Sequence, residues 1–225
     1  MTVTLFEVGG SIRDTFLGVE SDDRDFIAVC SDWNTFLDWC NTKMKKVFMK
    51  KEEHLTVRGM MACGQAIDIV MVHSNHENPW QDCWDDLLRR DFTINAMAQE
   101  VDPETLERTG WLIDPCGGKG HLEIKKLVQV GQNSIWSDKV RLLRAIRFAI
   151  KFDLEFFPQV KMCLESKEAW RQLMKQVPEE RVRQELAKCL KLDTAKTMQM
   201  LAGFEGAIES LFSGGIWLSP TVTKK

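Results

Sequence analysis

The spacing of apolar residues changes once along this chain of 225 residues, close to Pro115. Before Pro115, short apolar runs of strand length are bounded by glycines and acidic residues. After it, apolar residues recur every three or four positions over long segments, which is the pattern of amphipathic helices. We therefore expect an α+β fold, with a mixed sheet and helices in residues 1–115, an all-helical domain in residues 116–219 and a flexible tail over residues 220–225.

Individual elements can be placed from the same spacing. Ser11 is available to cap a short first helix, and Gly18 is expected to stop it. Strands are predicted over residues 3–8, 26–30, 55–61 and 66–72, the last two as a hairpin, and helices over residues 11–17 and 33–43. Helices without an intervening strand are predicted over residues 136–151, 158–174, 178–191 and 195–212.

Charge is distributed unevenly between the two halves. The net charge of the whole chain is −3, but residues 1–110 carry −9 and residues 111–225 carry +6. Clustered carboxylates can hold cations and a basic face can neutralise phosphates, although simple variation between domains explains the asymmetry equally well. No apolar run is long enough to cross a membrane, and the N-terminus lacks signal-peptide features, so a cytoplasmic protein with no membrane contact is expected. The seven scattered cysteines are predicted to be reduced structural thiols.

Two carboxylates separated by one residue stand at the edge of the second predicted strand. Asp23 and Asp25 should project from the same face, because side chains alternate along a strand. Two converging carboxylates suit a divalent cation, and Mg²⁺ held by carboxylates and substrate phosphates is the usual arrangement for phosphoryl transfer. Asp68, on a later strand, is a candidate third ligand and catalytic residue. By itself an Asp-x-Asp pair is more often a solvated surface feature.

A glycine-rich turn precedes this acidic pair. Gly9, Gly10 and Ser11 close the first strand and open the first helix, so their backbone N–H groups can approach a triphosphate closely. Arg13 can add a bidentate phosphate contact. Two glycines alone would favour a purely structural turn, but the ordered series of strand, glycines, arginine and paired aspartates is harder to explain by packing.

Five segments in this order resemble the motifs of class II tRNA nucleotidyltransferases, the CCA-adding enzymes, and of bacterial poly(A) polymerases. The resemblance runs over roughly residues 3–190, and its segments are Val8–Gly18 with Asp23–Val29, Arg89–Met97, Ile113–Gly118, Asp138–Phe148 and Glu179–Leu186. It implies a polymerase-β-like nucleotidyltransferase head followed by a helical neck. It also implies Mg²⁺ at Asp23 and Asp25, ATP and CTP as substrates, and the 3′ end of tRNA as the acceptor.

The resemblance further implies roles for residues of the later motifs. One of Arg89 and Arg90 is expected to reach the ribose or phosphates of the nucleotide while the other pairs with Asp91, and Asn95 is expected near the sugar, although a buried capping asparagine would look the same. Four residues are predicted to share one face of a helix whose other face carries Leu143, Ile146 and Ile150; they are Asp138, Arg141, Arg144 and Arg147. In the resembled family, Asp138 and Arg141 would read the incoming base, with Arg144 and Arg147 in support; a solvated basic face is the alternative.

Departures from the family pattern leave other activities open. Ser137 replaces the glutamate that usually precedes the base-reading aspartate, and the segment 73–85 is shorter than the flexible loop of CCA-adding relatives, so addition of CC alone is an alternative. The chain also ends soon after the expected neck, without body and tail domains, which points to weak tRNA binding or to a second subunit in a homo-oligomer. Poly(A) polymerase activity, a catalytically silent RNA-binding relative and transfer to a protein or small molecule are the remaining alternatives.

Overall fold

Two compact units make up the chain, residues 1–120 and residues 121–225. The computed structural model describes residues 3–19 and 24–212. The boundary between the units falls after Gly120, slightly beyond the boundary expected at Pro115.

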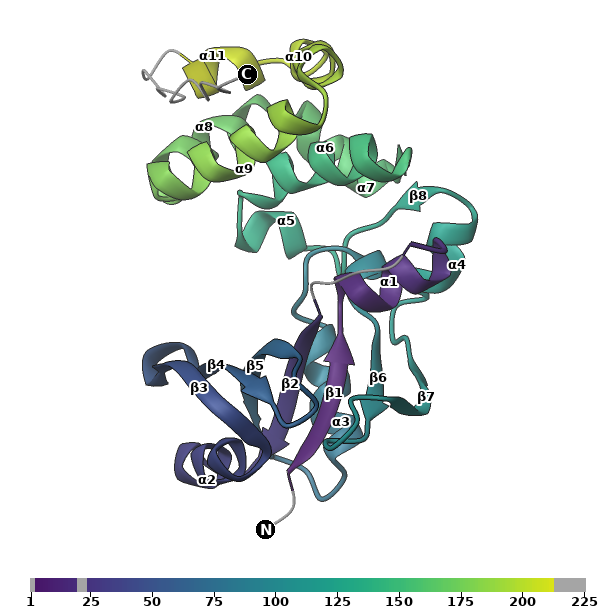
Figure 1. Ribbon diagram of the computed structural model, residues 1–225. Coiled ribbons are helices and arrows are strands. Elements are labelled where there is room, and N and C mark those ends of the chain that lie inside the picture. The colour runs from purple at the N-terminus through teal and green to yellow at the C-terminus, as the bar shows by residue number, and fades with distance from the viewer. Residues whose placement is uncertain (1–2, 20–23, 213–225) are drawn as a thin grey trace, which may run out of the picture. The chain divides into compact units, whose positions relative to one another are not determined.

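The first unit is built on a seven-stranded mixed sheet (Figure 1). Its strands are β1 (Thr4–Val8), β2 (Asp25–Cys30), β3 (Met44–Lys51), β4 (Thr56–Met61), β5 (Ala66–His73), β6 (Ala98–Val101) and β7 (Arg108–Ile113). They lie in the order β3-β4-β5-β2-β1-β6-β7. The pair β2 and β5 is parallel, while the other neighbours in the sheet are antiparallel. Such a mixed sheet with helices is the architecture expected for this half of the chain.

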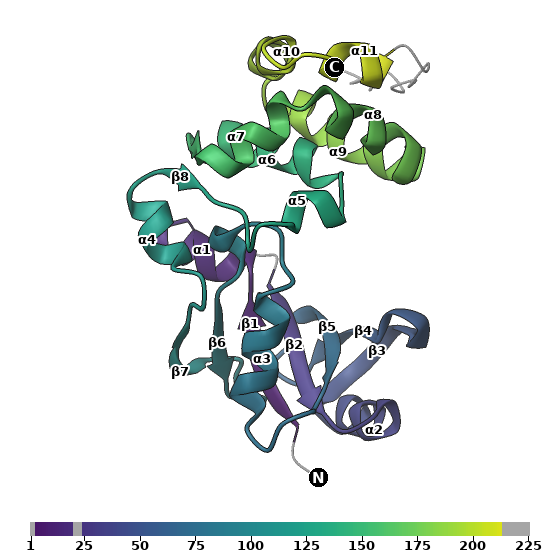
Figure 2. The same ribbon diagram turned by 180° about the vertical axis from the view of Figure 1, so that it is seen from behind.

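Helices cover both faces of this sheet. They are α1 (Gly10–Phe16), α2 (Trp33–Lys43) and α3 (Pro79–Leu87), with the 3₁₀ turns η1 (Glu52–His54) and η2 (Thr93–Asn95) and helix α4 (Gly118–Glu123), which extends across the unit boundary. Leu5 belongs to the core that includes Phe36 and Cys40 of α2, whereas its neighbour Phe6 contacts Trp80 of α3 edge to face. Because successive side chains point to opposite faces of a strand, α2 and α3 cover opposite faces. Figure 2 shows α3 running along β1 and β2.

Most of the elements predicted in this half are present. The helix α2 and the hairpin of β4 and β5 match their predicted positions, and Gly18, with φ of 67°, follows the end of α1. Ser11 is not the cap of α1, because the helix begins one residue earlier and Gly9 occupies the N-cap position. The strands β3, β6 and β7 were not predicted. In the lysine-rich edge strand β3, most side chains are exposed, which hides the alternation that marks a half-buried strand.

The second unit consists mainly of helices. They are α5 (Ser134–Ser137), α6 (Arg141–Phe152), α7 (Pro158–Glu165), α8 (Lys167–Gln176), α9 (Glu179–Leu192), α10 (Thr194–Ala202) and α11 (Ala207–Phe212). The largest fully buried side chain is that of Trp170 on α8, whose indole N–H donates to the carbonyl oxygen of Leu164 at 2.8 Å. The expected helical character of this half is confirmed.

Some predictions about the second unit were wrong in detail. Two short parallel strands, β8 (Lys126–Leu127) and β9 (Glu155–Phe156), are present where no strand was expected. Each long helix predicted over 136–151, 158–174 and 195–212 is divided into two. Between α7 and α8 the break falls at Ser166, whose side chain accepts from the backbone N–H of Ala169 and so caps a new helix. The predicted tail, residues 220–225, lies outside the described residues.

Within residues 3–19 and 24–212, no helix is long and apolar enough to cross a membrane. All seven cysteines are free thiols, and most of them are buried. This agrees with the structural role predicted for them.

Candidate active site

The two predicted catalytic carboxylates that the structure describes are brought together by strand register. Asp25, the first residue of β2, lies directly beside Asp68 of β5, since the two strands are parallel and these positions are partners. Partnered side chains in a parallel pair share a face, and neighbouring strands are about 4.8 Å apart. The two carboxylates, separated by 43 positions in sequence, are therefore neighbours on the face of the sheet covered by α3. Asp23 lies outside the described residues.

A cationic side chain accompanies this pair. Arg58 of β4, the register partner of Asp68 on its other side, donates from Nε and Nη2 to the two carboxylate oxygens of Asp68. Both side chains are partly exposed. Asp68 is thus already paired with a cationic side chain in this structure, which the sequence did not predict.

The donor set at Asp25 and Asp68 fits a hard divalent cation. No group of three or more His, Cys, Asp or Glu side chains that could hold a metal occurs in the part of the chain that the structure describes. Mg²⁺, however, needs only one or two carboxylates when water and substrate phosphates complete its octahedral shell. Asp25 is solvent-exposed at the start of its strand, so water can reach it there.

The turn between β1 and α1 requires glycine at position 9. Gly9 has φ of 77°, and a Cβ built on it would lie 3.0 Å from Nη1 of Arg90. Its backbone N–H donates to the carbonyl oxygen of Met97 at 2.9 Å. Gly10 begins α1, and Ser11 is buried in it. The geometry explains why glycine stands here, while phosphate binding by Gly9, Gly10 and Ser11 stays a prediction.

Arg13 and Asn95 meet in a buried network. Arg13, only 5% exposed, donates from Nη1 to Oδ1 of Asn95 at 2.5 Å and from Nε and Nη2 to Oδ1 of Asp14 at 2.8 and 2.7 Å. Asn95 in turn donates to Oδ1 of Asp91 at 3.1 Å. These contacts join α1 to the turn η2, across more than 80 positions of sequence. In this arrangement Arg13 and Asn95 hold the glycine turn against the motif Arg89–Met97, and their predicted contacts with phosphate and sugar stay predictions.

The two neighbouring arginines of that motif differ in their surroundings. Arg90 donates from Nε and Nη2 to Oδ2 of Asp86 at 3.2 and 3.0 Å, and its Nη1 approaches Gly9. Arg89 is exposed. Arg90 therefore lies against the glycine turn, and the contact of Arg89 or Arg90 with the nucleotide stays a prediction.

In the second unit, the predicted base-reading residues are not all on one helix. Asp138 lies in extended backbone after α5, and α6 begins only at Arg141. The helix prediction over 136–151 failed here because Asp138 accepts a hydrogen bond from the backbone N–H of Val140 and ends the preceding turn. Arg141, Arg144 and Arg147 do share the less buried face of α6, opposite Leu143 and Ile146. Ile150, expected on the apolar face, is half-buried and continues the arginine row.

Each of these polar side chains has a defined partner. Arg141 donates from Nη1 to the carbonyl oxygen and hydroxyl of Ser134 at 3.1 and 2.6 Å. Arg144 and Arg147 both lie over the ring of Phe148, 5.6 and 4.3 Å from its centroid. Arg147 also pairs with the nearly buried Glu185 of α9. The last contact gives Arg147 a structural role between α6 and α9.

The structure adds charged residues that the sequence did not indicate. Arg181 of α9 pairs with Oδ2 of Asp138 at 2.9 Å and restrains its carboxylate. In the first unit, Glu7 is fully buried and pairs with both Arg24 and Arg108. Glu7 could have been recognised in the sequence as a glutamate within an apolar strand. Such a carboxylate is expected to be buried, and a buried carboxylate requires charged or hydrogen-bonding partners.

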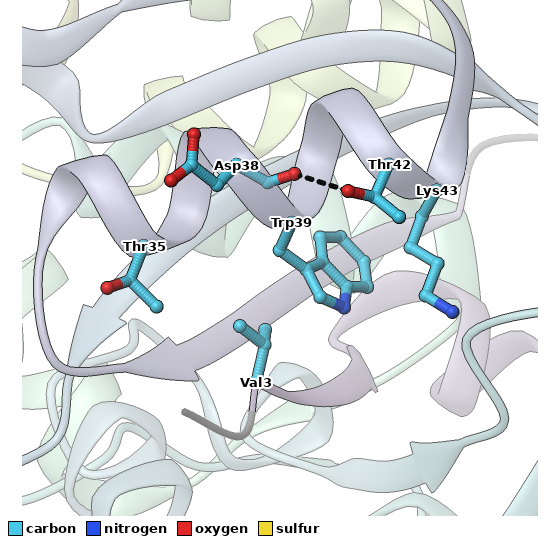
Figure 3. Close-up of a pocket in the computed structure, with 6 residues that line it drawn as sticks. All are labelled: Val3, Thr35, Asp38, Trp39, Thr42 and Lys43. Atoms are coloured by element: carbon cyan, nitrogen blue, oxygen red, sulfur yellow. Dashed lines mark hydrogen bonds between the residues drawn. The ribbon is translucent and has the colours of Figure 1, made fainter.

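A shallow hollow of about 350 Å³ lies in the first unit, away from these carboxylates (Figure 3). It is lined by Val3, Thr35, Asp38, Trp39, Thr42 and Lys43. Val3 precedes the end of β1 at which Thr4 pairs with Val29, whereas Asp25 pairs with Val8 at the other end. The hollow is therefore separate from the candidate site.

Residues 5–128, more than half of the chain, match the family described as the poly(A) polymerase head domain. Among curated proteins, the multifunctional CCA protein of Neisseria gonorrhoeae is 32% identical over 214 residues, covering 91% of this chain and 48% of that protein. The multifunctional CCA protein of Shewanella denitrificans is 31% identical over 216 residues, covering 92% of this chain and 50% of that protein. The chain spans about half the length of these relatives.

Solved structures give the same result. A CCA-adding enzyme in complex with CTP superposes with a TM-score of 0.80 at 29% identity, covering 94% of this chain and 48% of the other. The Thermotoga maritima CCA-adding enzyme complexed with tRNA superposes with a TM-score of 0.78 at 29% identity, covering 97% and 50% of the two chains. The resemblance in sequence, the fold and these matches agree: the chain belongs to the poly(A) polymerase head-domain family, and its relatives include CCA proteins and CCA-adding enzymes.

Proposed function

We propose that this chain transfers CMP and AMP from CTP and ATP to the 3′ end of tRNA, in a reaction that depends on Mg²⁺. The observation that carries the proposal is the placement of Asp25 beside Asp68 on parallel strands, next to the glycine turn of a head-domain family member. Relatives of similar fold are described in complex with CTP, with ATP and with tRNA, which supports these substrates.

In this proposal the metal ion is held by Asp25 and Asp68, together with Asp23, which lies outside the described residues. When bound, Mg²⁺ would lower the pKa of the attacking 3′-hydroxyl and neutralise charge on the triphosphate. Arg89 and the N–H groups of Gly9 and Gly10 would hold the phosphates, with Arg90 and Arg13 fixing the turn beneath them.

Selection of the base is assigned to Asp138 and Arg141. A carboxylate can accept a hydrogen bond from the exocyclic amino group of cytosine or adenine. Uracil and guanine have no amino group at the same place. A guanidinium group can donate to the acceptor atoms of the base ring. Asp138 retains acceptor capacity beside its bonds to Arg181 and Val140, since two carboxylate oxygens offer about four lone-pair positions.

Addition of CC without the terminal A is the second candidate. Only residues 74–78 separate β5, which ends at His73, from α3, which begins at Pro79. The longer flexible loop that the resembled family uses in changing from CTP to ATP therefore has little room between these elements. We prefer the full CCA reaction because a CCA-adding enzyme of similar fold is described in complex with ATP, the nucleotide that supplies the terminal A.

A transcript assay separates these candidates. Four tRNA transcripts, ending at the discriminator base, at C, at CC and at CCA, are each incubated with one labelled nucleotide and Mg²⁺. The proposal expects C on the first two, A on the third, nothing on the fourth and no reaction with EDTA. Absence of both C and A incorporation on every transcript would contradict it, C without A would establish the second candidate, and long A tracts would indicate a poly(A) polymerase.

A further inference from the structure

A buried ion-pair cluster lies beneath the start of β2, on the face of the sheet opposite Asp25. Its centre is Glu7 of β1, whose side chain is fully buried. Arg24 donates to Glu7 from Nε at 2.9 Å and from Nη2 at 2.6 Å. Arg108 of β7 donates to the same carboxylate from Nε and from Nη2, both at 2.9 Å. One negative charge is thus held between two guanidinium groups.

The position of Arg24 connects this cluster to the proposed metal site. Arg24 directly precedes Asp25, so their side chains leave the chain in opposite directions. Phe26, the register partner of Glu7, lies beneath the guanidinium group of Arg24, 5.1 Å from its carbon to the ring centroid. Arg24, Phe26 and Glu7 therefore occupy one face, and Asp25 with Asp68 occupies the other.

Arg24 has further anchors besides Glu7. Its Nη2 donates to the carbonyl oxygen of Leu106 at 2.7 Å, and its Nη1 donates to Oε1 of Gln65 at 3.2 Å, just before β5 begins. The guanidinium group thereby joins the start of β2 to β1, to the segment that leads into β5 and to the segment that leads into β7. Asp68 lies on β5, so the same side chain restrains both strands that carry the proposed metal ligands.

We infer that Arg24, anchored on Glu7, is a positioning residue for the carboxylate of Asp25. Asp25 is paired with Val8 of β1 and with Asp68 of β5, but it is the first residue of β2, and Arg24 just before it lies outside the strand. An anchor on Arg24 therefore helps to keep this ligand within the tolerance of a metal site. The guanidinium group supplies that anchor from the opposite face. This inference rests on the proposed function, because it concerns the metal ion of that reaction.

Arg108 provides a matched control within the same cluster. It pairs with Glu7 through the same two nitrogen atoms, and its side chain is 26% exposed compared with 20% for Arg24. Its other bonds to described residues lead to Thr15 and Ser11 of α1, and none of them reaches β2 or β5. Loss of Arg108 therefore weakens the cluster without loosening the start of β2.

The test compares Arg24→Gln, Arg24→Lys and Arg108→Gln with the unmodified protein. Binding of Mn²⁺ alone is measured by the electron paramagnetic resonance signal of the free ion, and the thermal midpoint of each protein is recorded by circular dichroism. Removal of a group bonded directly to a metal ligand weakens metal binding by about 10–100-fold. Arg24 acts from the opposite face, so Arg24→Gln should raise the Mn²⁺ dissociation constant by about tenfold, the lower end of that range. Arg24→Lys should show a smaller increase, since lysine keeps the charge but cannot pair through two nitrogens. Arg108→Gln should lower the thermal midpoint about as much as Arg24→Gln does. It should change the Mn²⁺ dissociation constant by less than about twofold, well below the change expected for Arg24→Gln.

Equal Mn²⁺ binding by Arg24→Gln and the unmodified protein would overturn the inference, as would an equal loss in Arg24→Gln and Arg108→Gln. If Arg24→Gln fails to fold, the comparison of Arg24→Lys with Arg108→Gln decides by the same criteria. The transcript assay on the unmodified protein is a separate arm: Mn²⁺ binding without nucleotide transfer would contradict the proposed function and still allow the positioning role to be decided.

Discussion

Replacement of Glu7 by glutamine should destabilise the first unit in a manner that depends on pH. Burial alone would raise the pKa of Glu7, but its hydrogen bonds with Arg108 and Arg24, together with the charge of Arg24, lower the pKa from 4.5 to about 2. A carboxyl group whose pKa is lower in the folded state stabilises that state at pH values above its unfolded pKa. The stabilisation is lost as the pH falls from about 4.5 towards about 2.

The size of the effect follows from the shift. One pKa unit corresponds to about 1.4 kcal/mol, so the ionised form of Glu7 contributes about 3 kcal/mol to the free energy of unfolding at pH 7. The same relation leaves about 1 kcal/mol at pH 3. Because a protonated glutamate resembles glutamine in shape and charge, Glu7→Gln should be about 3 kcal/mol less stable at pH 7, and the difference should shrink in acid.

Urea unfolding at pH 7, 5, 4 and 3, followed by tryptophan fluorescence and circular dichroism, measures this difference. Glu100→Gln serves as a control, since Glu100 is a half-buried carboxylate on the neighbouring strand β6. A stability difference for Glu7→Gln that stays constant from pH 7 to pH 3 would refute the reasoning, because the loss would then come from packing and not from the charge.

Three further predictions concern other parts of the chain. Asp25→Asn should reduce nucleotide transfer by at least about 100-fold with little change in thermal midpoint, because the side chain is exposed and its proposed role is to hold the metal ion. Gly118→Ala should destabilise the first unit by about 1–3 kcal/mol or more in urea unfolding, since a Cβ there would lie 2.1 Å from the carbonyl oxygen of Thr93. Arg181→Gln should release the carboxylate of Asp138 and lower the preference for CTP over UTP in kcat/KM by about tenfold, the loss of a charge-assisted hydrogen bond.

Each of these has its own control. If circular dichroism shows that Asp25→Asn is unfolded, the position is structural and not a metal ligand. Gly120→Ala is the control for Gly118→Ala, because no atom lies within 4 Å of the Cβ it would add, and equal effects of the two would contradict the steric explanation. Arg183→Gln is the control for Arg181→Gln, since Arg183 pairs with Glu179 and Glu180 of its own helix, and an equal loss of selectivity would argue against restraint of Asp138.

The sequence by itself was enough to predict local structure where regular apolar spacing ended at a clear turn or cap. Helix α2 and the hairpin of β4 and β5 have regular apolar spacing and a clear turn, and their predicted positions are confirmed. The division into a sheet-containing half and a helical half followed from the same signal. Prediction failed at the lysine-rich edge strand β3. It also failed at Asp138, whose carboxylate accepts from the backbone N–H of Val140 and so separates α5 from α6.

The tertiary structure decided which of the predicted residues meet and which additional residues support them. The sequence identified Asp25 and Asp68 as separate candidates, but only the parallel pairing of β2 with β5 makes them neighbours. Arg13 was predicted from its position after two glycines, yet its guanidinium group is buried against Asn95. Glu7 and its two arginines are far apart in sequence, and pairing over such distances depends on strand order, which local periodicity does not encode. The sequence therefore determined the chemistry present in the chain, and the folded sheet determined where that chemistry converges.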